Sequence, residues 1–304
     1  NDMKKILIAT EKPFTQIAVN GIKEIIESNG FKFSLLEKYT DKQQLLEASK
    51  DAAALIIRSD KIDAEVFEAS PNLEIVVRAG AGYDNVDLQA ATAHNVTVMN
   101  TPGQNSNAVA ELAIAMLLYQ YRNHFNGKAG SELRGKTIGL YAYGNVARYL
   151  GQIAKGFGMK VMAYRRSGVN EEGIIAATSP VELFEKCDIV SLHMPLTPET
   201  EKVVGYDFIT KMKPNAVIIN TARKEVINEE ELLKAFEERT DLCYLTDIAP
   251  KDLEKFNQQL GERFFATPKK MGAQTAEANI NAGLAAARQI VNFFKNNDIT
   301  FKVN

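Results

Sequence analysis

Two adjacent lysines, Lys269 and Lys270, lie in the segment ATPKKMGAQT (266–275), just before a long helix-like stretch. Neighbouring ammonium groups repel each other, and a turn beside a helix start already carries positive potential. A lysine transfers protons near neutral pH only where its surroundings lower its pKa from the ordinary value of about 10.4. The segment is therefore either a proton-transfer site or a solvated loop.

A second candidate site is the turn AYGNVA (142–147), which links a strand-like run to a helical pattern. It occupies the place of G-x-G-x-x-G, a turn that presents backbone N–H groups and a helix N-terminus to a pyrophosphate. Only the middle glycine is present, so a purely structural βαβ unit remains an alternative. The candidate cofactor contacts in this turn are Tyr143, Gly144, Asn145 and Val146.

The residues that follow the next strand concern the cofactor's ribose. Dinucleotide-binding folds that prefer NAD place an acidic residue there, about 20 positions beyond the turn. This chain has Arg165 and Arg166 instead. Arginine can bind a ribose 2′-phosphate, so the pair is compatible with NADP, whereas the alternative is a solvated loop.

Short apolar runs alternate with amphipathic stretches along the whole chain, which indicates parallel α/β architecture. Eleven strands exceed one comfortable sheet, so we predict two doubly wound domains. The expected strands are 5–10, 31–36, 53–58, 74–79, 96–100, 137–143, 160–164, 188–193, 216–220, 242–247 and 263–267. The apolar segment 99–122 is expected to form a helix buried between domains or subunits, and the end of the chain to rejoin the first domain.

The composition excludes several classes of partner. A net charge of -2 over 304 residues leaves no basic excess for nucleic acid or an anionic membrane. No apolar run is long enough to span a bilayer, and no signal peptide is recognisable. Cys187 and Cys243 lie in apolar runs and are expected to be reduced. We expect a cytoplasmic protein without a metal site.

Seven segments together carry a family resemblance. The chain resembles the D-2-hydroxyacid dehydrogenases, and among them the short D-3-phosphoglycerate dehydrogenases without a C-terminal regulatory domain. The segments are RAGAGYDNVD (78–87), NTPGQNSNAVAEL (100–112), LRGKTIGLYAYGNVA (133–147), GFGMKVMAY (156–164), DIVSLHMPLTPETE (188–201), MKPNAVIINTARKEVINEEEL (212–232) and ATPKKMGAQT (266–275).

The resemblance implies two Rossmann-like domains with a cleft between them, a nicotinamide cofactor (NAD or NADP) and a homodimer. Residues 1–99 and 280–304 would bind substrate, and residues 100–279 would bind the dinucleotide. Arg223 would bind the substrate carboxylate, helped by backbone N–H groups of Ala79 and Gly80. The implied cofactor contacts are His193, Pro195, Thr221, Ala222 and Asp247, although His193 could instead be structural.

The chain departs from the family pattern at two linked positions. Lys270 stands where the family has a general-acid histidine, and Asp252 where it has the glutamate that pairs with that histidine. A carboxylate would raise the pKa of a lysine, whereas Arg223, Lys269 and desolvation would lower it. Loss of the glutamate is therefore consistent with a lysine acid/base, as in a lysine-using branch of the phosphoglycerate dehydrogenases.

Positive side chains suggest an anionic substrate. Arg58, Ser59 and Arg78 follow two strands of the first domain, and Lys269 adds a charge; alternatively, Arg58 pairs with Asp60. We predict an enzyme that oxidises D-3-phosphoglycerate in serine biosynthesis. The alternatives are an NADPH-dependent glyoxylate or hydroxypyruvate reductase and a non-catalytic, nucleotide-sensing corepressor-like protein.

Overall fold

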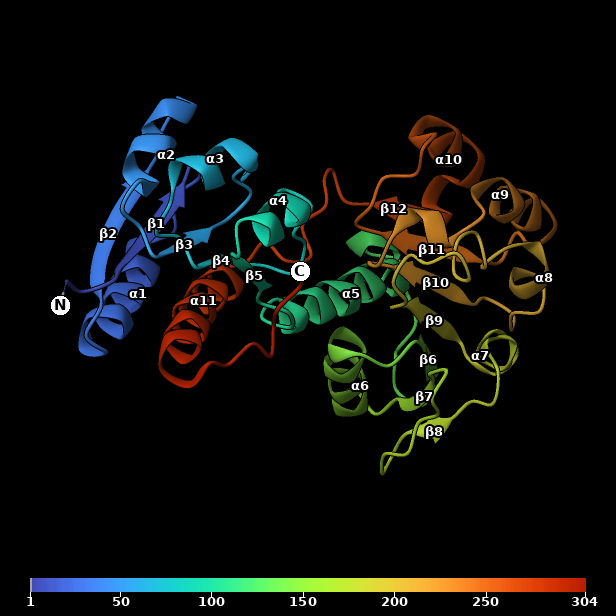
Figure 1. The fold of residues 1–304 in the computed structure, drawn as a ribbon. Coiled ribbons are helices and arrows are strands. Elements are labelled where there is room, and N and C mark those ends of the chain that lie inside the picture. Colours follow the sequence, from blue (N-terminus) through green and yellow to red (C-terminus); the bar gives the residue numbers. More distant parts are fainter. Residues whose placement is uncertain (1) are drawn as a thin grey trace. The chain divides into compact units, whose positions relative to one another are not determined.

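The computed structural model describes residues 2–304, which fold into two compact units (Figure 1). One unit runs to Asn105 and resumes at Ala273–Asn304, and the other is Ser106–Gly272. Each unit is built on one entirely parallel sheet, which confirms the predicted α/β class. The two units are described separately below.

The first unit has a five-stranded sheet in the order β2-β1-β3-β4-β5. Its central strands are continuous apolar runs because helices cover both faces of a parallel sheet. The strands are β1 (Lys5–Thr10), β2 (Lys32–Glu37), β3 (Ala54–Ile57), β4 (Ile75–Arg78) and β5 (Thr97–Asn100). The helices are α1 (Gln16–Ser28), α2 (Lys42–Ser49), α3 (Ala64–Ala69), α4 (Leu88–Ala93) and α11 (Ala276–Asn296).

The C-terminal part of the chain completes this first unit. Helix α11 begins at the cap Thr275, whose side chain accepts a hydrogen bond from Ala278 N, and lies beside α1 (Figure 1). The last residues then reach β5, where Val303 N donates to Val98 O. Chain ends far apart in sequence therefore share one core.

The second unit has a seven-stranded sheet in the order β12-β11-β10-β9-β6-β7-β8. Its strands are β6 (Thr137–Tyr141), β7 (Lys160–Tyr164), β8 (Ile175–Ala176), β9 (Ile189–Leu192), β10 (Val217–Asn220), β11 (Cys243–Thr246) and β12 (Phe264–Ala266). The prediction of eleven strands missed β8, which is only two residues long. The other strands are found within a few residues of their expected bounds.

Helices of the second unit cover both faces of its sheet. They are α5 (Ser106–Tyr121), α6 (Asn145–Gly156), α7 (Pro180–Lys186), α8 (Tyr206–Ile209), α9 (Glu229–Glu238) and α10 (Leu253–Leu260), with short turns η1 (Asn123–Phe125), η2 (Lys224–Val226) and η3 (Gly261–Arg263). The apolar helix α5 packs on α6 and β11 of its own unit. No helix of residues 2–304 is long and apolar enough to cross a membrane. Both cysteines are free, as predicted.

The packing of β6 against α7 generates the first testable prediction. A Cβ at Gly139 would lie 2.8 Å from Cys187 Sγ and 3.3 Å from Leu183 Cβ. We expect Gly139→Ala to lower the free energy of unfolding by about 1–3 kcal/mol, the usual cost of overpacking. Gly156→Ala at the end of α6 is the control, because no atom lies within 4 Å of its added Cβ. The urea midpoint of unfolding, followed by circular dichroism, should fall in Gly139→Ala but not in Gly156→Ala. Equal midpoints in the two variants would contradict the packing argument.

Candidate active site

The candidate cofactor residues of the second unit lie at one edge of its sheet. Parallel strands end at a common edge, and that edge is where α/β folds bind ligands. The first residues beyond β9, β10 and β11 are His193, Thr221 and Asp247, and Tyr143 is the second residue beyond β6. The topology therefore brings together residues that are more than 100 positions apart in sequence.

The phosphate turn has an unusual backbone. Ala142 adopts φ 78°, a left-handed conformation that glycine adopts without strain and alanine does not. At the position of the pattern's first glycine, the chain therefore has an alanine in a strained backbone conformation with positive φ. Gly144 is the N-cap of α6 and provides no side-chain cap, and an added Cβ there would meet nothing within 4 Å. The helix N-terminus consequently keeps N–H groups and positive potential for an anion.

Three buried polar atoms at this edge have no hydrogen-bond partner among residues 2–304. They are His193 Nε2, Thr221 Oγ1 and Asp247 Oδ1. Native proteins seldom leave buried polar atoms unpaired, so these atoms indicate the position of a bound polar ligand. Burial lowers the pKa of His193 to about 4, which keeps its ring neutral at neutral pH. With the uncapped N-terminus of α6, this set fits a nicotinamide dinucleotide and disfavours a purely structural histidine.

The remaining predicted cofactor residues lie around the same edge. Ala222 N donates to Asn220 Oδ1 at 3.0 Å, while Pro195 is exposed. Arg165 Nε donates to Gly168 O at 3.0 Å. Arg166 is exposed and forms no ion pair within residues 2–304. Both guanidinium groups therefore keep donors available for an anion.

The surroundings of Lys270 lower its pKa, as the sequence predicted. Desolvation is the largest cause and the charge of Arg223 is the second, while Asp247 and Glu225 oppose them. The residue as a whole is exposed, so solvent reaches the amine. The expected influence of Lys269 is not found among these causes. Its backbone instead accepts a hydrogen bond, from Thr267 Oγ1 at 2.7 Å.

Two carboxylates near this loop have different roles. Asp252 caps α10 by accepting from Lys255 N at 3.1 Å, so it does not replace the missing family glutamate. Asp247 is buried, and its Oδ2 accepts from Gly272 N at 2.9 Å. That bond fixes the lysine loop to the end of β11.

Arg223 is exposed, and its NH1 donates only to the neighbouring Ala222 O at 2.9 Å. No ion pair involves it among residues 2–304. A guanidinium in this state can meet a carboxylate with two parallel hydrogen bonds. Arg223 and Lys270 are close enough for their charges to interact, which the sequence predicted from the family pattern.

The first unit brings two arginines close together, and neither side chain forms an ion pair within residues 2–304, although the charges of Asp60 and Asp84 oppose the lowering of the Arg78 pKa. Burial and the charge of Arg58 both lower the pKa of Arg78, whose Nε is buried without a hydrogen-bond partner in residues 2–304. Arg58 donates to Lys12 O and Pro13 O at 3.2 and 3.0 Å. The alternative pairing of Arg58 with Asp60 is found only in part. Among residues 2–304 the Arg58 side chain forms no ion pair with Asp60, whose carboxylate accepts from Tyr39 Oη, Glu11 N and Arg58 N. Burial lowers the pKa of Arg58, and the charge of Asp60 opposes that effect.

The backbone groups expected to bind the substrate carboxylate need a correction. Ala79 N donates to Ile57 O and Gly80 N to Thr101 Oγ1, both at 2.8 Å, so neither N–H is available. The next two N–H groups, of Ala81 and Gly82, have no acceptor in the described part of the chain. They replace the earlier pair as candidates. Ser59 is exposed.

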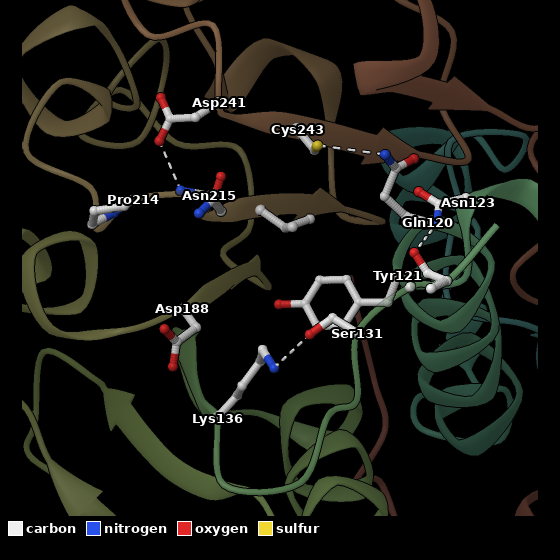
Figure 2. Close-up of a pocket in the computed structure, with 13 residues that line it drawn as sticks. Gln120, Tyr121, Asn123, Ser131, Lys136, Asp188, Pro214, Asn215, Asp241 and Cys243 are labelled. Atoms are coloured by element: carbon white, nitrogen blue, oxygen red, sulfur yellow. Dashed lines mark hydrogen bonds between the residues drawn. The ribbon is translucent and has the colours of Figure 1, made fainter.

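A cavity of about 480 Å³ lies at the opposite, amino edge of the second sheet (Figure 2). Its lining includes Lys136, Asp188 and Asp241, each of which precedes a strand. The two carboxylates already form ion pairs at 3.0 Å, with Lys213 and Arg239. None of the candidate catalytic, substrate-binding or cofactor-binding residues lines this cavity, so they belong to the carboxyl edge.

Comparison with known proteins agrees with this geometry. Residues 111–269 match the model described as "D-isomer specific 2-hydroxyacid dehydrogenase, NAD binding domain". A solved, NAD⁺-bound 3-phosphoglycerate dehydrogenase from Entamoeba histolytica is 47% identical, with a TM-score of 0.83, and the match covers 100% of this chain and 99% of that one.

Two curated relatives are similarly informative. A D-3-phosphoglycerate dehydrogenase from Methanocaldococcus jannaschii is 34% identical over 268 residues, covering 82% of this chain and 51% of that protein. This chain thus spans about half the length of that relative. A hydroxypyruvate reductase from Thermotoga maritima is 32% identical over 300 residues, covering 92% of this chain and 94% of that protein.

The strained alanine of the phosphate turn yields the second prediction. We expect Ala142→Gly to raise the free energy of unfolding by about 1 kcal/mol, because glycine adopts the left-handed backbone without strain. Ala176→Gly in the extended strand β8 should instead be neutral or destabilising. Urea midpoints of the two variants measure the difference. A loss of stability in Ala142→Gly as large as in the control would show that the turn is not strained.

Proposed function

The chain belongs to the D-isomer specific 2-hydroxyacid dehydrogenase family, and we propose that it oxidises D-3-phosphoglycerate at C2, a step of serine biosynthesis. Its NAD-dependent oxidoreductase chemistry follows from that membership. The observation that carries the substrate assignment is the pair Arg58 and Arg78. Two like charges that interact, with one buried Nε unpaired, form a good binding site for a dianionic phosphate.

Each predicted residue then has a chemical role. Arg223 binds the substrate carboxylate with two hydrogen bonds and polarises the C2 oxygen. The neutral amine of Lys270 accepts the proton of the C2 hydroxyl, and its lowered pKa makes that form accessible. The nicotinamide cofactor, when bound, supplies the hydride acceptor. Backbone N–H groups at the start of α6 hold its pyrophosphate, and Asp247 Oδ1 is an acceptor for its carboxamide.

The division of labour along the chain is also part of the proposal. Residues 1–99 with 280–304 bind substrate, and residues 100–279 bind the dinucleotide. Ala81 and Gly82 contribute N–H groups to the substrate carboxylate, and Lys269 adds positive charge near it. We further propose a cytoplasmic homodimer. The assignment of D-3-phosphoglycerate as substrate is supported by the relatives that are named phosphoglycerate dehydrogenases.

One alternative activity has an observation in its favour. Arg165 and Arg166 lack acidic ion-pair partners within residues 2–304, as a 2′-phosphate site requires, and the Thermotoga relative is named a hydroxypyruvate reductase. This favours an NADPH-dependent reductase of glyoxylate or hydroxypyruvate. A non-catalytic nucleotide sensor is no longer a candidate, because family membership identifies the chain as an enzyme.

The deciding experiment follows the absorbance of the reduced nicotinamide. The oxidation assay uses 3-phosphoglycerate or D-glycerate, and the reduction assay uses 3-phosphohydroxypyruvate, hydroxypyruvate or glyoxylate, each with both cofactors. The proposal expects the highest kcat/KM for 3-phosphoglycerate in the oxidation assay and for 3-phosphohydroxypyruvate in the reduction assay. A higher kcat/KM for hydroxypyruvate or glyoxylate with NADPH would establish the alternative.

Removal of the lysine amine tests its role as acid/base. We expect Lys270→Ala to reduce kcat by roughly 10²–10⁴-fold, the usual loss for a general acid or base. In the unchanged protein, oxidation requires the neutral amine of Lys270, so kcat should rise with pH and then level off. The midpoint of the rise should lie below the ordinary pKa of lysine. Lys255→Ala, on the exposed face of α10, is the matched control. A near-normal kcat in Lys270→Ala would return the lysine pair to a solvated loop.

Substitution of Arg58 tests the phosphate contact. We expect Arg58→Gln to raise KM for 3-phosphoglycerate by about 10–100-fold, in line with loss of a charged hydrogen bond, and KM for D-glycerate much less. Glutamine still offers donors to Lys12 O and Pro13 O, which limits structural damage. The exposed Lys61→Gln removes a nearby charge as the control. Equal changes for both substrates would mean that Arg58 does not meet the phosphate.

A further inference from the structure

A hydrogen bond joins the phosphate turn to the loop that carries Arg165 and Arg166. Tyr143, in the turn, donates its hydroxyl to Glu171 Oε2 at 2.5 Å, 28 residues along the chain. We propose that this bond is a latch that holds the loop of residues 165–173 in place and keeps Glu171 away from the two arginines, so that it sets cofactor affinity. The inference rests on the proposed position of the cofactor over the turn.

The tyrosine half of the latch is rigid. Its side chain is buried, with 4% of the residue exposed, so the ring position is fixed by the core of the second unit. Burial, and then Glu171, raise the pKa of Tyr143 to about 12. The hydroxyl consequently keeps its proton at all working pH values and acts as the donor.

The glutamate half would not be held without specific partners, because its side chain is 44% exposed. Arg148 provides a second one. Its NH1 lies 4.0 Å from Glu171 Oε2, and its guanidinium lies 4.9 Å from the centre of the Tyr143 ring. Helix α6, the turn and the loop therefore meet at a triangle of three side chains.

The rest of the loop is folded onto α6 and onto itself. Val169 and Ile174 pack against the same core as Tyr143, and Gly168 N donates to Arg165 O at 2.8 Å. These contacts define the path of the loop. The latch adds a direct connection between the turn that would bind the pyrophosphate and the loop that would bind the ribose.

The latch has a consequence for charge as well as for position. Glu171 lies on the same loop as Arg165 and Arg166, yet it forms no ion pair with either one, because Tyr143 and Arg148 bind it. A released carboxylate would be free to pair with these arginines and compete with a 2′-phosphate. Breaking the latch should therefore weaken all cofactor binding, through lost preorganisation, and NADPH binding most.

The test removes one oxygen atom. Tyr143→Phe keeps the ring under Arg148, and the matched control is Tyr149→Phe on α6, whose exposed hydroxyl has no partner among residues 2–304. Fluorescence titration of NADH and NADPH gives the dissociation constants. We expect Tyr143→Phe to raise that of NADH roughly threefold and that of NADPH roughly tenfold, as for loss of one partly exposed charged hydrogen bond. Steady-state kinetics should show a raised cofactor KM with little change in kcat.

A second pair of variants separates position from charge. Glu171→Ala removes the acceptor of the Tyr143 hydroxyl and leaves no carboxylate, so the affinities for NADH and NADPH should fall equally; Glu172→Ala is its control. The double variant that also carries Tyr143→Phe should reduce the affinity for NADH no more than either single change, because both changes remove the same interaction.

The result that overturns the latch is a set of Tyr143→Phe dissociation constants equal to those of Tyr149→Phe, even if the melting temperature falls. Arg165→Asp distinguishes this failure from failure of the proposed cofactor position. If Arg165→Asp changes the ratio of the NADPH and NADH dissociation constants while Tyr143→Phe changes neither constant, only the latch is overturned. An unchanged ratio in Arg165→Asp together with a silent Tyr143→Phe would overturn both.

Discussion

The buried carboxylate of Asp247 is the group on which the carboxyl edge of the second sheet depends. One oxygen fixes the lysine loop by accepting from Gly272 N, where an added Cβ would lie only 3.0 Å from that oxygen. The other oxygen is buried and unpaired, and so is free for a polar ligand. Its charge also raises the pKa of Lys270. Asp247 thus contributes to the position of the loop, to the contact with a ligand and to the basicity of the lysine.

The pKa of Lys270 is a balance rather than the result of one neighbour. Desolvation and Arg223 favour the neutral amine, whereas Asp247 and Glu225 favour the ammonium. A histidine in this position needs a carboxylate partner to hold its tautomer, but a lysine with such a partner would be too basic. Asp252 stands at the sequence position of that partner and is occupied in capping α10. The absence of the carboxylate partner is therefore consistent with a lysine, rather than a histidine, at position 270.

The sequence was sufficient wherever function follows from residue type and strand order. Eleven strands, the edges at which they end and the lowered pKa of Lys270 were predictable, because apolar runs and charge have local signatures. The free N–H groups were misplaced by two residues, since Ile57 O and Thr101 Oγ1, on other strands and loops, decide which amides remain available. The bond from Tyr143 to Glu171 was invisible because it depends on how a loop folds back over α6. Such contacts carry no spacing that a sequence pattern could reveal.

The distribution of acidic residues completes the argument for anion binding. Asp60 lies next to Arg58 in sequence and could have neutralised it, but its carboxylate is buried and already accepts three hydrogen bonds, from Tyr39, Glu11 and Arg58 N. Glu171 is similarly occupied by Tyr143 and Arg148, away from Arg165 and Arg166. In each unit a nearby carboxylate is bound by hydrogen-bond donors that leave the arginine side chains unpaired. Donors of both arginine pairs therefore remain available to an anion, which is consistent with the phosphate-bearing ligands proposed above.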